Sequence, residues 1–245
     1  MTIALFSDIH ANLPAFEAML QDMDKRNPDA IYCLGDLVGY HIWPNEIIAE
    51  IRDRKIATLK GNHDEKVEHI LTTEESLSVS GNEYAYHIIG KDERKYLFDL
   101  PSYITVDYKI DHGNLRIAMA HGSTRKINEY ILEDTDADYV INMMDESNAD
   151  ILVVGHSHIP YHRVLKDSNG KYKHVINTGS VGKPKDFDNR GGYVILTIHD
   201  YSTLEIEDSI NVKFIRFEYD IEKSVKAIKN SPLPNELAER LIIGK

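Results

Sequence analysis

Short, mostly apolar runs recur along this chain, and most of them end in a polar motif. The runs cover residues 3–6, 30–34, 56–59, 116–120, 151–154 and 173–176. Runs of this length, bounded by Gly and polar residues, are typical of buried strands. Between the first three runs, residues 14–25 and 44–54 carry apolar side chains at helical spacing, each with a Pro near its start. This alternation of strand and helix predicts parallel strands joined by right-handed crossovers.

The later part of the chain predicts a mixture of hairpins and helices. Residues 65–100 are polar and read as mostly helical. Turn signals at residues 111–114 and 167–170 predict two hairpins. Residues 137–146 predict a helix, residues 193–198 and 213–218 predict strands, and residues 221–230 and 235–243 predict a helical tail. We therefore expect one α/β domain over residues 1–245, with two packed sheets and a mostly helical insertion at about 65–100.

Composition excludes several classes of protein. The chain has 245 residues and a formal net charge of −12, which disfavours binding to a nucleic-acid polymer. The one cysteine, Cys33, lies in an apolar run and predicts a small core residue in a reduced compartment. No basic, apolar leader and no apolar stretch of about 20 residues is present, so we expect a cytoplasmic protein without a membrane span.

The polar motifs that follow the runs carry the candidate chemistry. If the strands are parallel, their carboxyl ends meet at one edge, where ligands bind in open α/β sheets. The side chains delivered there are carboxylates, imidazoles and one amide, which suit borderline to hard divalent metals. They are too many for one ion and about enough for two. The seven candidate ligands are Asp8, His10, Asp36, Asn62, His121, His156 and His158.

The spacing of these residues supports a shared site. Asp8 and His10 are two residues apart and can reach one ion from a loop. Gly35 permits the sharp turn that presents Asp36, whose two oxygens can bridge two cations. A single His or Asp after a strand is usually a turn former or a hydrogen-bonded side chain. Seven such residues at like positions after five strands are difficult to explain by coincidence.

In these motifs the sequence resembles the calcineurin-like metallophosphoesterases. The shared elements, in order, are Asp8-x-His10, Gly35-Asp36, Gly61-Asn62-His63-Asp64, His121-Gly122 and Gly155-His156-x-His158. The resemblance implies an αββα four-layer sandwich of two mixed β-sheets flanked by helices. It implies two divalent cations, Mn²⁺ first and Fe, Zn²⁺, Ni²⁺ or Co²⁺ as alternatives. It assigns one cation to Asp8, His10, Asp36 and His158, and the other to Asp36, Asn62, His121 and His156.

The resemblance also assigns two catalytic residues and a reaction. His63 would face the substrate without binding metal, and Asp64 would orient His63. The reaction would be hydrolysis of a small phosphodiester, phosphomonoester or dinucleoside polyphosphate by direct attack of a metal-bridging hydroxide. Many relatives continue Gly-Asp-x-x-Asp-Arg, whereas residues 35–40 here read Gly-Asp-Leu-Val-Gly-Tyr. That difference argues against a protein phosphatase and resembles the small prokaryotic branch of the family.

Two alternatives and a substrate pocket complete the expectations. The alternatives are a nuclease of the same superfamily and a non-catalytic scaffold that keeps the fold. The partner expected is a small phosphorylated substrate, and the oligomeric state is left open. The aromatic residues after the Asp36 turn could form the wall of a substrate pocket, and one arginine could hold a second phosphate. These substrate-pocket candidates are Tyr40, His41, Trp43 and Arg190.

Overall fold

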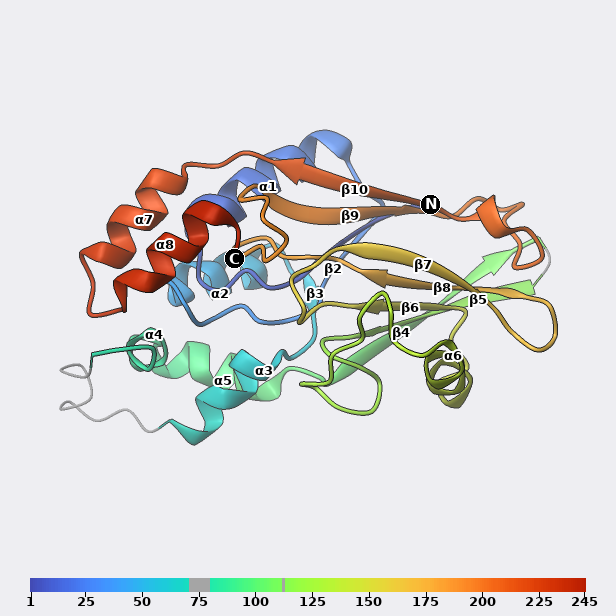
Figure 1. Cartoon of the computed structure of the whole chain (residues 1–245), viewed down its shortest axis with the longest axis horizontal. Coiled ribbons are helices and arrows are strands. Elements are labelled where there is room, and N and C mark those ends of the chain that lie inside the picture. The colour runs from blue at the N-terminus through green and yellow to red at the C-terminus, as the bar shows by residue number, and fades with distance from the viewer. Residues whose placement is uncertain (71–79, 112) are drawn as a thin grey trace.

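The computed structural model describes residues 1–70, 80–111 and 113–245, which form two five-stranded sheets packed face to face (Figure 1). The first sheet has the order β10-β9-β1-β2-β3 and the second has the order β4-β5-β6-β8-β7. The strands of the first sheet are β1 (Thr2–Phe6), β2 (Ala30–Cys33), β3 (Ala57–Thr58), β9 (Gly191–Thr197) and β10 (Asn211–Phe217). The strands of the second sheet are β4 (Tyr103–Ile110), β5 (Gly113–Ala120), β6 (Ile151–Val154), β7 (Tyr161–Lys166) and β8 (Tyr172–Asn177).

Both sheets are mixed. In the first sheet β1, β2 and β3 run parallel, and β9 and β10 complete it through antiparallel pairs. In the second sheet β5, β6 and β8 run parallel, with β4 and β7 antiparallel at its edges. The predicted fold class is confirmed, including both hairpins, although the first hairpin turn contains residue 112, which lies outside the described residues.

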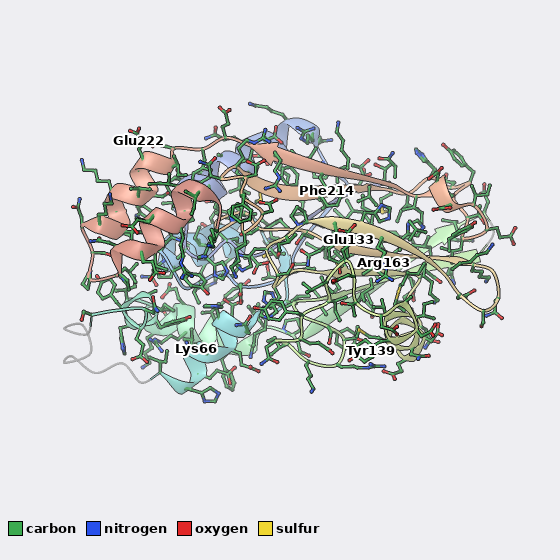
Figure 2. The ribbon with its side chains drawn as sticks, in the orientation of Figure 1. Lys66, Glu133, Tyr139, Arg163, Phe214 and Glu222 are labelled. Carbon is green, nitrogen blue, oxygen red and sulfur yellow. The ribbon has the colours of Figure 1, made fainter. Side chains whose placement is uncertain are left out.

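Alternation of side chains along the strands separates the layers. Ile3 and Leu5 of β1 pack between the two sheets, against residues such as Ile117 of β5. Ala4 and Phe6 point the other way, into the core under the helices of the first sheet. Because successive side chains of a strand point to opposite faces, a run that is apolar throughout must be covered on both faces. Figure 2 shows side chains filling the space between the ribbons.

Helices cover the outer faces of the two sheets. Helices α1 (Leu13–Arg26) and α2 (Pro44–Asp53) bury apolar side chains against the first sheet. Helix α6 (Ala137–Glu146) covers the second sheet, where its Met143 and Met144 join the β6 residue Leu152. Helix α1 begins where the Asn12 side chain accepts a hydrogen bond from the backbone N–H of Ala15, as expected of an N-cap.

Two groups of smaller helices lie at one end of the molecule (Figure 1). The first group contains α3 (Asn62–Lys66), the 3₁₀ turn Val67–His69, α4 (Tyr84–His87) and α5 (Lys91–Asp99). It covers the expected insertion at 65–100, of which residues 71–79 lie outside the described residues. The second group is the C-terminal pair α7 (Ile221–Lys229) and α8 (Asn235–Ile243). The two groups meet in an apolar cluster that includes Ala85, Ile228 and Leu237 and borders Tyr40.

None of the helices in the described part of the chain is both long and apolar enough to cross a membrane. One further 3₁₀ turn, Glu207–Ser209, precedes β10. The division of the chain into a single domain stays a prediction.

Candidate metal centre

Loops at the carboxyl ends of five strands bring the seven predicted ligands together. They follow β1, β2 and β3 in the first sheet, and β5 and β6 in the second. The backbone N–H of Asp8 donates to the carbonyl of Gly35 at 3.0 Å, and the N–H of His10 donates to the carbonyl of Asp36 at 3.0 Å. Parallel neighbouring strands end at the same edge of a sheet, so their loops interlock there.

The loops hold their ligands in an unusual backbone conformation. Asp8, His10, Asp36, His156 and His158 all have positive φ values, between 51° and 65°. Each such residue costs on the order of 1 kcal/mol or more, because the side chain crowds its own backbone. Concentrated in one place, this strain is a mark of a functional site, since the surrounding structure must stabilise it.

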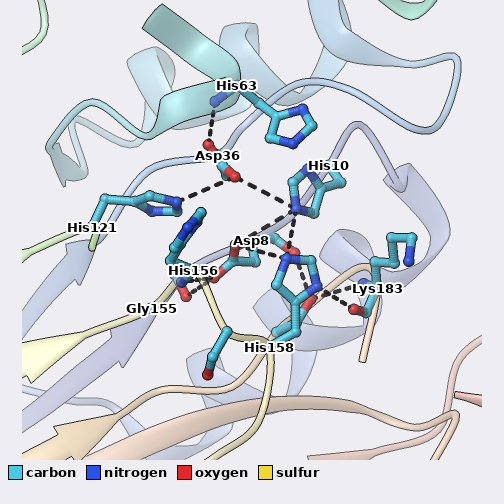
Figure 3. A network of polar contacts seen from close by, with 12 residues as sticks. Asp8, His10, Asp36, His63, His121, Gly155, His156, His158 and Lys183 are labelled. Carbon is cyan, nitrogen blue, oxygen red and sulfur yellow. Dashed lines mark hydrogen bonds and ion pairs between the residues drawn. The ribbon is translucent and has the colours of Figure 1, made fainter. Parts of the chain in front are cut away.

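Asp8, His10 and His158 form the first cluster of possible ligands (Figure 3). Oδ1 of Asp8 lies 3.2 Å from Nε2 of His158 and 3.5 Å from Nε2 of His10. The two imidazole Nε2 atoms are 3.2 Å apart. The other Asp8 oxygen accepts hydrogen bonds from the Ser7 hydroxyl at 2.5 Å and the His156 backbone at 3.1 Å. Oδ1 is buried and has no hydrogen-bond donor among the described residues, so it is available to a cation.

Asp36, His121 and His156 form the second cluster. Oδ2 of Asp36 lies 3.2 Å from Nε2 of His121, and the same oxygen lies 3.7 Å from Nε2 of His10 in the first cluster. Asn62 adds its amide oxygen, 3.0 Å from Nε2 of His121. Asp36 Oδ2 and His156 Nε2 are buried and without a hydrogen-bond partner in the described part of the chain. Asp36 therefore stands between the clusters, in the place that a bridging carboxylate needs.

The histidines are oriented by the backbone. Nδ1 of His10 donates to the carbonyl of Val38 at 3.0 Å, Nδ1 of His121 to that of Leu34 at 2.8 Å, and Nδ1 of His158 to that of Lys183 at 2.5 Å. A hydrogen bond from one ring nitrogen fixes the tautomer and leaves the other as a lone pair for metal. The Nε2 atoms of all three rings consequently face the clusters, where a bound cation would take the place of the second proton of His121.

Electrostatics favour positive charge at this site. Burial opposes ionisation of Asp8 and Asp36, but the surrounding imidazoles outweigh it and hold the pKa of both carboxyls below its usual range. Burial lowers the pKa of His10 to about 4. Burial acts on His121 in the same direction, yet the Asp36 carboxylate outweighs it and raises the His121 pKa to about 10. Buried carboxylates, lone pairs without donors and mixed N/O donors together fit divalent metal ions.

The structure corrects the role expected for Asp64. Its fully buried carboxylate accepts hydrogen bonds from the backbone N–H groups of Asp36 at 2.8 Å, Leu37 at 2.9 Å and Gly61 at 2.9 Å. Asp64 therefore joins the Asp36 loop to the start of α3, and among the described residues the hydrogen bond to the ring of His63 comes from Tyr86. Burial and the neighbouring Asp36 charge raise the Asp64 pKa to about 7, against the effect of these donors.

His63 lies beside the clusters, and its ring is held by a residue that the sequence did not single out. Its backbone N–H donates to Asp36 Oδ1 at 2.8 Å. Its ring packs edge-on against His10, with 4.9 Å between centroids, and Nδ1 lies 2.5 Å from the hydroxyl of Tyr86 on α4. Burial lowers the pKa of His63 to about 3, so the ring is neutral before a cation or substrate binds.

Of the four predicted substrate-pocket residues, Tyr40 lies at the site. Its ring centroid is 4.7 Å from that of His10 and 4.8 Å from that of His63. His41 is only 2% exposed, and its Nδ1 donates to the His10 carbonyl at 2.8 Å. The expectation that His41 forms a pocket wall is therefore wrong, because its ring supports the His10 loop from behind.

The structure places Arg190 in an ion pair at the surface, whereas the role of Trp43 in a substrate pocket stays a prediction. The Arg190 guanidinium is exposed and binds both oxygens of Asp188, at 2.7 to 3.2 Å, which corrects its expected role at a second phosphate. Trp43 precedes α2, and its backbone N–H donates to the Ala11 carbonyl at 3.3 Å.

Sequence reasoning missed three residues around the clusters: Tyr86, Tyr130 and Lys183. The Tyr130 ring packs against His156, with 4.2 Å between centroids. The Lys183 ammonium lies 4.9 Å from the centre of the Tyr40 ring, and its pKa is lowered to about 8 by burial. None of the three stands in a short motif at a strand end. Only Lys183 lies within a few residues of a predicted strand end, that of the run 173–176, which could have drawn attention to it.

Comparison with known proteins agrees with this geometry. A family model described as the calcineurin-like phosphoesterase superfamily domain matches residues 1–201. The chain is 34% identical to an uncharacterized protein of Methanocaldococcus jannaschii, over 99% of this chain and 98% of that protein.

Two solved structures resemble the whole fold. The crystal structure of a metallophosphoesterase from Sphaerobacter thermophilus superposes with a TM-score of 0.77 at 28% identity, covering 100% of this chain and 99% of that one. A hypothetical protein from Pyrococcus horikoshii OT3 also gives 0.77, at 22% identity, with 100% and 98% covered, which shows a shared fold. Together with the family model, the sequence identity and the His/Asp clusters, these likenesses show that the chain belongs to the calcineurin-like phosphoesterase superfamily.

Proposed function

We propose that this protein is a phosphoesterase that uses two divalent cations to hydrolyse a small phosphodiester, phosphomonoester or dinucleoside polyphosphate. The observation that carries the proposal is the position of Asp36, which belongs to the second cluster and places its Oδ2 3.7 Å from Nε2 of His10 in the first. In this proposal Asp8, His10, Asp36 and His158 hold one cation, and Asp36, Asn62, His121 and His156 hold the other. Mn²⁺ is the first candidate, because mixed oxygen and imidazole donors suit it, and Fe, Zn²⁺, Ni²⁺ and Co²⁺ suit the same donors.

Bound cations would supply a nucleophile from water near neutral pH and would neutralise charge on the phosphoryl oxygens. The chain itself supplies orientation. The loops hold the donor atoms in place before any cation arrives, through backbone carbonyls that bind Nδ1 of His10, His121 and His158. Such prepositioned charge and dipoles need no rearrangement during the reaction, which is the main source of electrostatic catalysis.

His63 is proposed to act on the substrate. Its neutral ring lies beside both clusters and has one nitrogen without a hydrogen-bond partner among the described residues. A neutral imidazole N–H can donate a hydrogen bond to a phosphoryl or leaving oxygen and so stabilise charge that develops there. Tyr40, next to His63, offers an aromatic surface on which an aryl group or nucleobase could stack.

The first experiment compares hydrolysis of bis(p-nitrophenyl) phosphate and p-nitrophenyl phosphate by metal-stripped protein supplied with Mn²⁺. Asp36→Asn, which keeps the shape of the side chain but removes its charge, should lower turnover at least about a hundredfold. Asp107→Asn is the matched control, since Asp107 lies on the edge strand β4 in a surface pair with Arg116. Turnover that survives Asp36→Asn would contradict the proposal.

Metal analysis separates the possible reasons for inactivity. Wild-type protein with two bound cations per chain and no turnover on either compound would favour the non-catalytic scaffold. Wild-type protein that binds no divalent cation would contradict the proposed metal centre itself. Preference for the diester over the monoester would direct the substrate search to nucleotide diesters and dinucleoside polyphosphates.

A further inference from the structure

We propose that Tyr86, in the helical insertion, is a positioning residue that fixes the ring of His63 with Nε2–H facing the site. The catalytic consequence of this role rests on the proposed function, whereas the contact between Tyr86 and His63 does not depend on it. The Tyr86 hydroxyl is 2.5 Å from Nδ1 of His63, and the two rings are nearly parallel, at 17° with 6.0 Å between centroids. Tyr86 is 3% exposed, so water does not compete freely for this contact.

The backbone around Tyr86 is held by a partly buried arginine. The Arg94 guanidinium, from α5, donates to the carbonyl of Tyr86. It also donates to the carbonyls of Val67 at 3.2 Å, Ile70 at 2.8 Å and Ile89 at 3.2 Å. One side chain therefore ties α4 and α5 to the 3₁₀ turn that follows α3, the helix that carries His63. The distance between Tyr86 and His63 is consequently fixed from both ends.

Gly39 leaves the space in which the two rings meet. A Cβ at this position would lie 2.6 Å from Nδ1 of His63 and 3.3 Å from the Tyr86 hydroxyl. The residue also has a φ of +91°, which favours glycine. Lys66, on α3, places its ammonium over the Tyr86 ring, 5.2 Å from the ring centre. Any larger residue at 39 would displace the contact between the two rings.

The direction of the hydrogen bond determines the tautomer. A tyrosine hydroxyl is protonated at ordinary pH and donates readily, so Nδ1 of His63 accepts its hydrogen. The ring proton of neutral His63 then resides on Nε2, the nitrogen with no hydrogen bond to the described residues. Without the Tyr86 hydroxyl, the proton is free to move to Nδ1, which leaves a lone pair facing the substrate oxygens. That arrangement repels the oxygens that an Nε2–H group would stabilise.

The test compares Tyr86→Phe with Tyr84→Phe. Both residues lie on α4, but Tyr84 packs beside the C-terminal helices and makes no described contact with His63. Tyr86→Phe should lower kcat on bis(p-nitrophenyl) phosphate about tenfold, the value of one hydrogen bond, with KM and bound metal unchanged. In a His63→Ala background the same substitution should change kcat less than twofold, because its route to the substrate has been removed.

A spectroscopic measurement tests the positioning without using activity. In zinc-loaded protein labelled with ¹⁵N-histidine, two-bond ¹H–¹⁵N spectra report which nitrogen of each ring carries the proton. The wild-type His63 signals, identified by their loss in His63→Ala, should show Nε2–H, and Tyr86→Phe should change them while Tyr84→Phe does not.

The two measurements also distinguish failure of the positioning role from failure of the proposed function. An unchanged His63 tautomer in Tyr86→Phe overturns the positioning role, whatever the activity. An equal fall in kcat in both His63 backgrounds likewise overturns it, because Tyr86 would then act independently of His63. If the wild type has no phosphoesterase activity, the proposed function fails while the tautomer measurement still decides the role of Tyr86.

Discussion

Among the described residues, two pairs of histidines bring ring nitrogens to within 3.2 Å of each other, and one of these pairs lies in the candidate metal centre. Nε2 of His10 is 3.2 Å from Nε2 of His158, and their rings stack at 26° with 4.9 Å between centroids. In the second sheet, Nε2 of His162 on β7 is 3.0 Å from Nδ1 of His174 on β8, with the rings at 16° and 5.2 Å. By distance and stacking alone the pairs are nearly equivalent.

The difference lies in what the other ring nitrogens do. Nδ1 of His10 and His158 both donate to backbone carbonyls, so two Nε2 lone pairs face each other beside the unpartnered Asp8 Oδ1. Three acceptors without a hydrogen between them call for a shared cation. In the other pair, Nδ1–H of His174 can donate to the Nε2 lone pair of His162, and no described carboxylate pairs with either ring. The orientation of the outer nitrogens, more than the distance between the rings, identifies the metal site.

The largest expected effect comes from removing one ring of each pair. His158→Ala should lower kcat/KM at least about a hundredfold and reduce bound metal, because it deletes a donor and leaves Asp8 partly unpaired. His174→Ala should leave kcat/KM per folded molecule and metal content within about twofold of wild type, although it opens a cavity that lowers the free energy of unfolding by a few kcal/mol. Phosphodiester kinetics and metal analysis on both variants show which histidine pair binds metal. Loss of metal in His174→Ala would contradict the assignment of the metal site to the His10–His158 pair.

Most of the fold was predictable because its strands are short and apolar on both faces. The run Ile151–Val154 must be covered on both sides, and the structure places Ile151 and Val153 between the sheets and Leu152 and Val154 beneath α6. Sequence gives no comparable sign of which strands pair at distance, such as β1 with β9. Pairing of that kind depends on side-chain packing between segments almost 200 residues apart, which no local pattern encodes.

The second expected effect is destabilisation by chelation. Removing cations from the wild type leaves Asp8, Asp36 and the facing Nε2 lone pairs buried without partners, so EDTA should lower the free energy of unfolding by about 3 kcal/mol when metal is present at a hundred times its dissociation constant. Urea unfolding with and without EDTA measures this. His158→Ala should show a much smaller EDTA effect, and His174→Ala should show the wild-type effect. Equal EDTA sensitivity in His158→Ala and wild type would place the stabilising cation elsewhere.

The candidate site was predictable as a set of ligands but not as a set of roles. Asp8, His10 and His156 each stand in a motif directly after a strand, so the topology alone brings them together. The contact between Tyr86 and His63 depends on the course of the helical insertion, and the burial of His41 depends on the loop folding back beneath His10. These are tertiary arrangements of residues whose types are ordinary in loops and cores.

The third effect concerns the pH dependence of stability, and it is expected of the His162–His174 pair. Burial, with a smaller contribution from His162, lowers the pKa of His174 from 6.5 to about 4. A histidine whose pKa is lower in the folded state than in the unfolded state contributes its full stability at pH values above the unfolded-state pKa. That contribution is lost as the pH falls from about 6.5 towards 4. Compared with His174→Phe in EDTA, the wild type should lose an additional amount on the order of 2 kcal/mol across this range. Parallel pH profiles of unfolding free energy for the two proteins would contradict the buried, neutral state of His174.

The smallest effect tests the internal hydrogen bond of the second pair. His162→Gln keeps an acceptor near Nδ1–H of His174, whereas His162→Phe keeps the ring shape and removes the acceptor. A buried N–H left without a partner costs about 1–3 kcal/mol, so His162→Phe should unfold at lower urea than His162→Gln by about 1 kcal/mol of stability, since His162 is only half-buried and water can partly replace it. If His162→Gln and His162→Phe are equally stable, the His162–His174 contact is packing without a hydrogen bond, and orientation of the ring nitrogens loses its value as the criterion that separates the two pairs.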